Sequence, residues 1–347
     1  MYYFSEKNIR GNHAGTKARN DVEEILKWNN CKPFNKRQFI LTSDSNDNIH
    51  SNINNRIQLF SLESDIKKLK NEIVFVQYPM LAFDNEKEFY KLIKRKNKLV
   101  LLVHDIHGLK RQNQNEINKE IELLNIADAV IVHNRFMKDK LIQLGLNVQH
   151  IYLLNIFDYL TKSKLNINRF EKNSIIFAGN LDKSDFFKSF CKNNQLLKFN
   201  LYGPHYDRAL DSMYNLEYVG NYNPDILPEK LMGQYGLVWD GDQINTCHGI
   251  YGEYTKYNNP HKLSLYLSSG IPVIVWKEAA IAEFVENNHV GLVVSTLSNL
   301  YQLINNITKT EYETMCENVL RIREELIHGR SLTKVIKKIN DDFMDIE

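Results

Sequence analysis

The stretch Gly249–Val275 reads GIYGEYTKYNNPHKLSLYLSSGIPVIV, and it predicts a loop, a short helix and a buried strand in succession. Pro260 suits the first turn of a helix, and Asn258 or Asn259 is placed to cap that turn. Gly270 is placed to end the helix. The apolar, β-branched run that follows is typical of a parallel strand covered on both faces. This segment therefore predicts one strand–helix unit of an α/β sheet.

Lys262 falls in the first turn of that helix, where a cation opposes the helix dipole. A lysine at this place favours a bound anion such as a diphosphate, because the anion would offset the unfavourable charge. The alternative interpretation is a solvated surface lysine.

The same rhythm of short apolar runs and longer amphipathic stretches continues in both directions along the chain, and it predicts an α/β protein with parallel sheets. The predicted strands are 73–77, 99–103, 129–132, 174–178, 197–202, 236–239, 272–276 and 291–294. The predicted helices include 18–28, 86–96, 115–125, 135–144, 261–269, 279–287 and 332–343.

The rhythm pauses in the polar stretch 155–172, and a fresh strand begins at Ser174. We therefore expect two doubly wound, Rossmann-like domains that face each other across a cleft, with domain 1 at 1–158 and domain 2 at 172–328. For the C-terminal segment 329–347 we consider a helix that packs back on domain 1.

Composition excludes several classes of protein. The 347 residues carry a formal charge of only +2, which is too small for the usual footprint of a nucleic-acid binder. No stretch approaches the ~18 apolar residues of a membrane-spanning helix, and no signal peptide is recognisable. We expect a cytoplasmic protein. The four cysteines are too scattered for a disulfide scaffold or a zinc ribbon: Cys31, Cys191, Cys247 and Cys316.

Polar residues follow the predicted strand 99–103, where the sequence reads His104-Asp105-Ile106-His107-Gly108. Ligands of open α/β sheets bind at the carboxyl ends of strands, so these side chains are candidates for chemistry. Two imidazoles and a carboxylate there could position and deprotonate a hydroxyl group. Alternatively, Asp105 caps the next turn while one histidine packs in the core.

A second loop, Ile9–Lys17, precedes the predicted helix 18–28 and contains Gly11 and Gly15. Glycines allow a close approach to the backbone, and a helix N-terminus stabilises anions or hydroxyl groups. The loop lacks the GxGxxG spacing of dinucleotide-binding proteins. A flexible turn is the alternative interpretation.

The chain resembles GT-B glycosyltransferases, whose nucleotide-binding domain often reads Pro-x-Lys-x-x-x-Tyr-Leu-x-x-Gly-x-Pro-Val. Here the match is PHKLSLYLSSGIPVIVW at 260–276, followed by AAIAEFVENNHVGLVV at 279–294. The longer form YGEYTKYNNPHKLSLYL resembles bacterial galactofuranosyltransferases of polysaccharide assembly. The chain is also similar to the glucosyltransferases that extend O-linked N-acetylglucosamine on serine-rich adhesins. Those enzymes share a loop ending like Thr16, a strand-end His-Asp, and a motif like Phe177–Lys183.

The resemblance implies a donor site for a UDP-sugar. Lys262 would bind the diphosphate, and Lys183, where relatives have arginine, would assist it. Thr16 in domain 1 would reach the donor when the cleft closes, and Tyr202 would line the pocket for the base. The full set of expected donor-binding residues is Thr16, Gly15, Asn180, Lys183, Tyr202, Asn258, Asn259, His261 and Lys262.

One departure from the resemblance bears on the chemistry. Many retaining relatives carry two glutamates eight residues apart around this helix, where this chain has Tyr257 and Leu265. We therefore favour an inverting reaction, in which a base in domain 1 deprotonates the acceptor hydroxyl. Asp105 is the first choice for that base. Its rivals are His104, His107 and His13. Lysines and backbone N–H groups would meet the leaving-group charge, so we expect no metal and no cofactor beyond the donor.

The resulting hypothesis is an enzyme that moves a sugar, galactofuranose by resemblance, from a UDP-sugar to a glycan acceptor on lipid or protein. Transfer of glucose or galactopyranose, and a non-catalytic nucleotide-binding partner of a glycosyltransferase complex, are the alternatives. The resemblance also implies a homo-oligomer. The basic stretch Tyr90–Lys98 could touch an anionic membrane, with an exposed helix end as the alternative.

Overall fold

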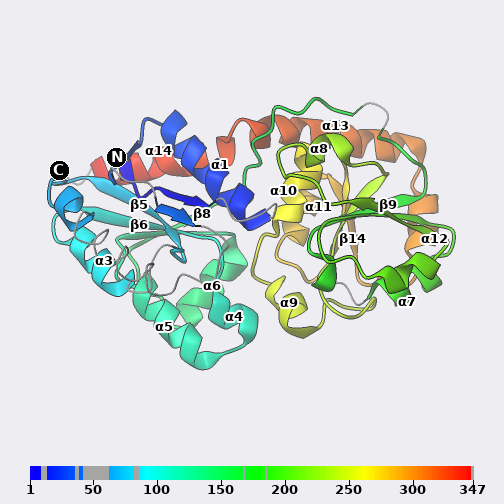
Figure 1. Cartoon of the computed structure of the whole chain (residues 1–347), viewed down its shortest axis with the longest axis horizontal. Helices are drawn as coiled ribbons and strands as arrows, with labels where there is room; N and C mark the ends of the chain where they lie inside the picture. The colour runs from blue at the N-terminus through cyan, green and yellow to red at the C-terminus, as the bar shows by residue number, and fades with distance from the viewer. Residues whose placement is uncertain are drawn as a thin grey trace. The chain divides into compact units, whose positions relative to one another are not determined.

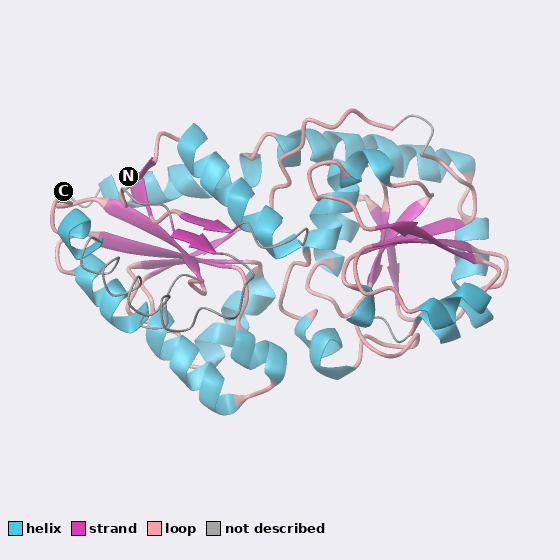
Figure 2. Ribbon diagram, viewed as in Figure 1, coloured by secondary structure: helices cyan, strands magenta, loops and turns pink. Residues whose placement is uncertain are grey.

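The computed structural model describes residues 1–8, 14–35, 39–41, 62–81, 86–166, 169–183 and 186–344 (Figure 1). Chain contacts divide it into two compact units. Unit 1 comprises Met1–Gly11, Arg19–Leu154 and Leu332–Glu347, and unit 2 comprises Asn12–Ala18 and Asn155–Ser331. Each unit has a parallel six-stranded sheet with helices on its faces (Figure 2), which confirms the α/β prediction.

The sheet of unit 1 has the strand order β3-β1-β5-β6-β7-β8. Its central strands are buried along nearly their whole length, as parallel strands covered on both faces must be. The strands are β1 (Tyr2–Tyr3), β3 (Lys32–Pro33), β5 (Ile73–Tyr78), β6 (Lys98–Val103), β7 (Ala129–Val132) and β8 (His150–Leu153), and β2 (Glu6–Asn8) pairs separately with β4 (Phe39–Leu41). The helices are α1 (Ala14–Trp28), α3 (Glu86–Lys94), α4 (His107–Arg111), α5 (Gln114–Leu124), α6 (Arg135–Gln143) and α14 (Arg330–Met344).

The sheet of unit 2 has the order β11-β10-β9-β12-β13-β14. Its strands are β9 (Ser174–Ala178), β10 (Lys198–Tyr202), β11 (Leu216–Gly220), β12 (Tyr235–Val238), β13 (Val273–Trp276) and β14 (Gly291–Val294). Its helices are η1 (Leu181–Lys183), α7 (Phe187–Asn193), η2 (Arg208–Ser212), α8 (Leu227–Lys230), α9 (Gly249–Tyr254), α10 (His261–Ser268), α11 (Ala282–Asn288), α12 (Leu300–Asn306) and α13 (Lys309–Ile327).

Both sheets reverse their strand order once, and ligands of open α/β sheets bind at the carboxyl ends of the strands beside such a switch point. In unit 1 the switch lies between β1 and β5, and in unit 2 it lies between β9 and β12. Ligand-binding residues are therefore expected near the carboxyl ends of β1 and β5 in unit 1 and of β9 and β12 in unit 2.

The described C-terminal helix α14 packs on unit 1. The hydroxyl of Tyr152 on β8 donates to Asp342 at 2.7 Å, and the rings of His150 and Phe343 meet edge to face with centroids 5.1 Å apart. Thr333 near the start of α14 accepts a hydrogen bond from the amide of Asn29.

The eight predicted strands all exist, with ends displaced by at most one residue. The prediction that α1 starts at residue 18 is wrong, because the helix already includes Ala14 and so contains Gly15 and Thr16. The start of α11 is also wrong: the expected 279 is part of a turn, and the helix begins at Ala282. Sequence reasoning missed β8, which begins with a histidine and is mostly half-buried, and β11, whose exposed positions break the apolar pattern.

Candidate active site

Helix α10 is attached firmly to the sheet of unit 2. The hydroxyl of the buried Tyr266 accepts a hydrogen bond from the backbone N–H of Ala178 at the end of β9. The ring of Tyr266 lies so close to Gly236 on β12 that a β-carbon there would come within 2.3 Å of it. Ser264 adds a hydrogen bond to the carbonyl of Phe157 at 2.6 Å. These contacts fix the N-terminus of α10 at the switch point between β9 and β12.

Lys262 lies in the first turn of α10, and its ammonium group lies at this switch point. Its Nζ is 2.7 Å from Oδ1 of Asp240, which follows β12, and 4.1 Å from the ring centroid of Phe177 on β9. The side chain also passes Gly179, where a β-carbon would come within 2.8 Å of Cε. A cation with one carboxylate partner beside uncapped helix N–H groups is suited to a phosphate-bearing ligand.

The predicted cap of α10 is wrong. Pro260 itself occupies the N-cap position with an extended backbone, and its side chain cannot bond to the first turn. Asn259 instead donates its amide to the carbonyl of Asn155 at 2.7 Å. Among the residues that the structure describes, none forms a hydrogen bond with the buried side-chain oxygen of Asn258. The prediction that Gly270 ends the helix is confirmed, since this residue adopts φ +75° just after the C-cap.

The other expected donor-binding residues differ in where they lie. The ring of His261 packs on Phe157 with centroids 4.8 Å apart, at the start of α10. The side-chain oxygen of Asn180, two residues after β9, accepts a hydrogen bond from the N–H of Asp182. Lys183 ends η1, and its side chain lies outside the described part of the chain. Tyr202 is fully buried, and its hydroxyl donates to the carbonyl of Lys230 and accepts from the N–H of Met232.

The backbone after β9 and β10 is packed unusually closely. A β-carbon on Gly203 would lie 1.9 Å from the carbonyl oxygen of Gly179, and Gly203 has φ +135°. Only glycine accepts both this contact and this backbone conformation. Gly203 is buried like Tyr202, so its missing side chain serves this packing of backbone against backbone.

Thr16 and Gly15 belong to the segment of α1 that groups with unit 2. Thr16 is buried and Gly15 is exposed. The next residue, Lys17, explains the grouping: its ammonium donates to the carbonyl of Leu160 at 2.6 Å and lies 3.2 Å from the carboxylate of Asp225. Residues 9–13, with Gly11 and His13, lie outside the described residues.

His104, Asp105 and His107 follow β6 at the strand end of unit 1, and each has different neighbours. His104 follows β6, and its Nε2 lies 2.7 Å from the side-chain oxygen of Gln77 on β5. Asp105 is partly exposed, and Lys110 lies 3.3 Å from its carboxylate. His107 begins α4, where its N–H and that of Gly108 donate to Glu120. Glu120 thus does the capping that was one interpretation of Asp105.

Burial shifts the basicity of the histidines near this strand end. It lowers the pKa of His107, while the charge of Asp105 opposes the shift. It lowers the pKa of His133 to about 4, although the carboxylate of Asp105 and hydrogen bonds to the backbone oppose this shift. His133 lies after β7, with Nε2 3.1 Å from the carbonyl of Val103. His133, which the sequence analysis did not consider, is buried in the core, whereas His104 and His107 are half-buried.

Sequence reasoning passed over Asp240-Gly241-Asp242, which places two carboxylates two residues apart after β12. Asp240 could have been found by the pattern that singled out Asp105, because both are acidic residues just after a buried strand. In the structure Asp240 pairs with Lys262, and Asp242 lies 3.3 Å from Nδ1 of His248. Throughout the described ranges, no three histidine, cysteine or acidic side chains gather as a metal site would require.

The basic stretch Tyr90–Lys98 is largely occupied by acidic neighbours. Lys91 pairs with Glu88, and both Lys94 and Lys98 pair with Asp128. Among the helices that the structure describes, none combines the length and the apolar character that crossing a bilayer takes.

Comparison with known proteins shows the family. The model of the glucosyltransferase 3-like N-terminal domain matches residues 1–156, and that of the C-terminal domain matches residues 175–339. The chain is 30% identical to the β-1,6-galactofuranosyltransferase WbbI of Escherichia coli K12 over 99% of both chains. It is 30% identical to glucosyltransferase 3 of Streptococcus gordonii over 69% of this chain and 70% of that protein.

Solved structures agree on the fold. The Anabaena protein Alr3699/HepE, crystallised in complex with UDP, superposes with a TM-score of 0.63 over 98% of this chain and 99% of its own, at 13% identity. Sucrose-phosphate synthase from Thermosynechococcus elongatus gives a TM-score of 0.61 over 98% and 99% of the chains, at 12% identity. With two parallel sheets, matching domain models for both halves and a full-length relative, this chain is a GT-B glycosyltransferase of the glucosyltransferase 3-like family.

Proposed function

We propose that this glycosyltransferase transfers galactofuranose from UDP-galactofuranose to a hydroxyl group of a glycan acceptor in cell-surface polysaccharide or glycoprotein synthesis. The observation that carries the proposal is the 30% identity to a galactofuranosyltransferase along 99% of both chains. Transfer from UDP-glucose or UDP-galactopyranose to a glycosylated protein is the second candidate, and the similarity to two streptococcal proteins named glucosyltransferase 3 favours it.

The geometry of unit 2 supports a donor site at the N-terminus of α10. In the proposed complex the diphosphate replaces Asp240 as the partner of Lys262 and accepts hydrogen bonds from the first N–H groups of α10. Gly179 is partly exposed and carries no side chain, so a phosphate or ribose oxygen can approach its backbone. Asn180, His261 and the buried oxygen of Asn258 are further candidates for contacts with the donor.

The proposed reaction inverts the anomeric carbon. The acceptor hydroxyl oxygen forms a bond to that carbon as the bond to the diphosphate oxygen breaks. The hydroxyl proton passes to a base at the end of β6, either Asp105 or His104, and the electron pair leaves on UDP. Lys262 and the N-terminus of α10 stabilise the charge that grows on the leaving group, so the reaction needs no metal.

The test is a panel of UDP-galactofuranose, UDP-galactopyranose and UDP-glucose, with UDP release as the readout and UDP binding measured by calorimetry. Loss of a charge-assisted contact to phosphate predicts that Lys262→Ala weakens UDP binding about tenfold to a hundredfold. Lys309→Ala is the matched control, because Lys309 also lies in the first turn of a helix but its side chain is 88% exposed.

Release of UDP from UDP-galactofuranose alone would support the sugar assignment. Preference for UDP-glucose would move the proposal to the second candidate. Equal UDP binding by wild type, Lys262→Ala and Lys309→Ala would remove Lys262 from the donor site. Activity that disappears in EDTA and returns with a divalent cation would overturn the metal-independent mechanism.

The proposal also covers the oligomeric state of the protein, its location in the cell and its acceptor. We propose a homo-oligomer that works on the cytoplasmic side of a membrane and meets its acceptor on lipid or protein. Analytical ultracentrifugation tests the first, and co-sedimentation with anionic vesicles tests peripheral contact with a membrane. A monomer that stays in the supernatant would contradict both.

A further inference from the structure

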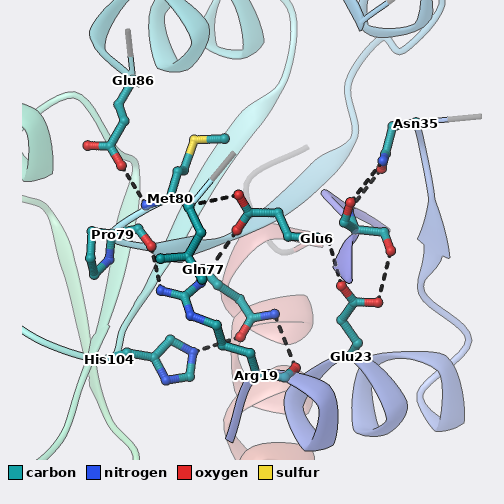
Figure 3. A network of polar contacts seen from close by, with 11 residues as sticks. Glu6, Arg19, Glu23, Asn35, Gln77, Pro79, Met80, Glu86 and His104 are labelled. Atoms are coloured by element: carbon teal, nitrogen blue, oxygen red, sulfur yellow. Dashed lines mark hydrogen bonds and ion pairs between the residues drawn. The ribbon is translucent and has the colours of Figure 1, made fainter. Parts of the chain in front are cut away.

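A buried polar network occupies the switch point of unit 1, and the proposed reaction assigns no role to it (Figure 3). Its central members are Glu6 after β1, Arg19 on α1 and Gln77 on β5, which are 2%, 5% and 4% exposed. Burial of charged and amide groups is costly unless every group is hydrogen-bonded. The outermost member of this network is the half-buried His104.

The guanidinium of Arg19 is held from two sides. One nitrogen lies 3.4 Å from the carboxylate of Glu6, and the other donates to the carbonyl of Pro79 after β5. The second oxygen of Glu6 accepts the N–H of Leu81 at 2.9 Å. The carboxylate of Glu23, one turn after Arg19, accepts the N–H of Glu6. Helix α1 is therefore attached around Arg19 to the start of β2 and to the segment that follows β5.

This attachment fixes the orientation of the amide of Gln77. Its Nε2 donates to the backbone carbonyl of Arg19 at 3.3 Å, and its Oε1 lies 2.7 Å from Nε2 of His104. A flipped amide would place its oxygen against the carbonyl of Arg19, and two acceptors repel each other. The oxygen of Gln77 therefore faces His104.

The orientation of Gln77 decides the tautomer of His104. An amide oxygen only accepts hydrogen bonds, so Nε2 of His104 carries the proton in this contact. In a neutral imidazole the other nitrogen, Nδ1, is then the basic one. The backbone N–H of His104 donates to the carbonyl of Tyr78 at 2.8 Å, which holds the residue at the end of β6.

We propose that Gln77, supported by Arg19 and Glu6, is the positioning residue that keeps His104 protonated at Nε2, so that Nδ1 is the base of the transfer reaction. In that step Nδ1 takes the proton of the acceptor hydroxyl, the hydroxyl oxygen bonds to the anomeric carbon, and the diphosphate leaves with the electron pair of the broken bond. The inference rests on the proposed function for the reaction, but the tautomer is a property of the free protein.

In this arrangement His104 is the base, and Gln77 is the group that orients it. Asp105, the rival, has its carboxylate engaged by Lys110, and protonating it would cost that ion pair. The charged and titratable groups that act on this network include Glu6, Asp105, Tyr90 and Glu86, which act on Arg19, and Asp105 also acts on His107 and His133.

The direct test is nitrogen NMR of the protein labelled with ¹⁵N-histidine, which distinguishes the two neutral tautomers, with His104→Gln to assign the signal. We expect protonation at Nε2 in the wild type and a mixture of tautomers in Gln77→Met, which keeps the length of the side chain but offers no oxygen. Protonation at Nδ1 in the wild type would overturn the inference.

The kinetic test uses the same variants with the donor identified above. We expect Gln77→Met to lower kcat by at least about tenfold with an unchanged donor KM, because general bases typically contribute 10²–10⁴-fold and the donor contacts lie in unit 2. Gln234→Met is the control, a buried glutamine of unit 2 whose oxygen accepts the N–H of Asn173.

The outcomes separate the inference from the proposed function. A wild type that binds UDP but transfers no sugar from any donor would contradict the proposed function and leave the tautomer result standing. An unchanged kcat in Gln77→Met together with a changed tautomer would contradict the role of His104 as base. Equal losses in Gln77→Met and Gln234→Met would show an effect on folding and overturn the positioning role.

Discussion

The two switch points have the same topology and opposite contents. In unit 1 the edge between β1 and β5 is filled by the chain's own buried side chains, and Arg19 is neutralised by Glu6 and held by backbone groups. In unit 2 the switch point between β9 and β12 carries close-packed glycines and Lys262, and within the described part of the chain the ion-pair partner of Lys262 is the carboxylate of Asp240. One switch point is internally satisfied, and the other offers a cation beside a helix N-terminus that has no side-chain cap.

The two switch points are therefore suited to different roles. A satisfied network is rigid and can orient a neighbour such as His104, but it has no capacity left for a ligand of its own. A partly exposed ion pair beside a helix N-terminus exchanges its carboxylate for a phosphate at small cost. Doubly wound topology thus supplies two places for chemistry, and the side chains decide which is a support and which is a binding site.

The largest expected effect concerns the glycines of unit 2. Gly203→Ala should destabilise the protein by more than about 4 kcal/mol, because the new β-carbon would overlap the carbonyl oxygen of Gly179 and neither backbone can move aside. Urea unfolding measures the loss, with UDP binding as a second readout. A loss below about 2 kcal/mol would show that this edge is more adaptable than the structure indicates.

Gly145→Ala is the matched control for that experiment. Gly145 also has a positive φ, +105°, but a β-carbon there would meet only Cγ2 of Ile121 at 3.7 Å, an ordinary contact. Its cost should be the backbone strain alone, about 1–2 kcal/mol. The difference between the two variants isolates the close approach of the two strands' ends.

The next effect concerns unit 1 and the pH dependence of stability. Burial raises the pKa of Glu86, whose carboxylate accepts the N–H of Met80, from 4.5 to about 7. The folded state then binds this proton more tightly than the unfolded state, so the free energy of unfolding falls as pH rises from 4.5 to 7. His133, with its pKa lowered from 6.5 to about 4, has the opposite slope, and its stabilisation is lost as pH falls from 6.5 to 4.

Between pH 4.5 and 6.5 these two contributions oppose each other, and each amounts to at most about 3 kcal/mol over its full range. Relative to wild type, Glu86→Gln should gain stability with rising pH up to about 7 and then level off. His133→Gln should gain relative stability as pH falls below 6.5. Denaturant titrations at a series of pH values check both slopes, and parallel profiles for wild type and either variant would contradict the shift for that group.

Much of the fold was predictable because buried parallel strands are recognisable in the sequence as short apolar runs. The eight runs named from the sequence are all strands, and Gly270 ends α10 as expected. The failures have physical causes. The exposed positions of β11 hide its pattern, and the start of α1 was placed too late because Gly15 looked like a loop residue.

The site was predictable only in part. Lys262 and the strand-end residues His104 and Asp105 stand out because their positions in a local element suffice to suggest chemistry. Arg19 and Gln77 are different, since their proposed role arises from contacts between α1, β2 and β5 that no local pattern encodes. Gln77 does leave a trace, as the one polar residue in the buried run IVFVQY.

The smallest expected effect concerns the ion pair of Asp240 with Lys262, and it tests whether Asp240 competes with UDP for the lysine. If the two edges differ as described, the ion pair at 2.7 Å must break when a diphosphate binds, and removing it should make UDP binding tighter. Both side chains are partly exposed, and such pairs contribute about 0.2–1 kcal/mol, so Asp240→Asn should lower the Kd for UDP by about fivefold at most. The gain should shrink at high salt, because screening already weakens the ion pair in the wild type. Calorimetry at two salt concentrations measures both effects. Weaker UDP binding in Asp240→Asn would instead make Asp240 a residue that holds Lys262 in place, and the edge of unit 2 would then be as pre-arranged as that of unit 1.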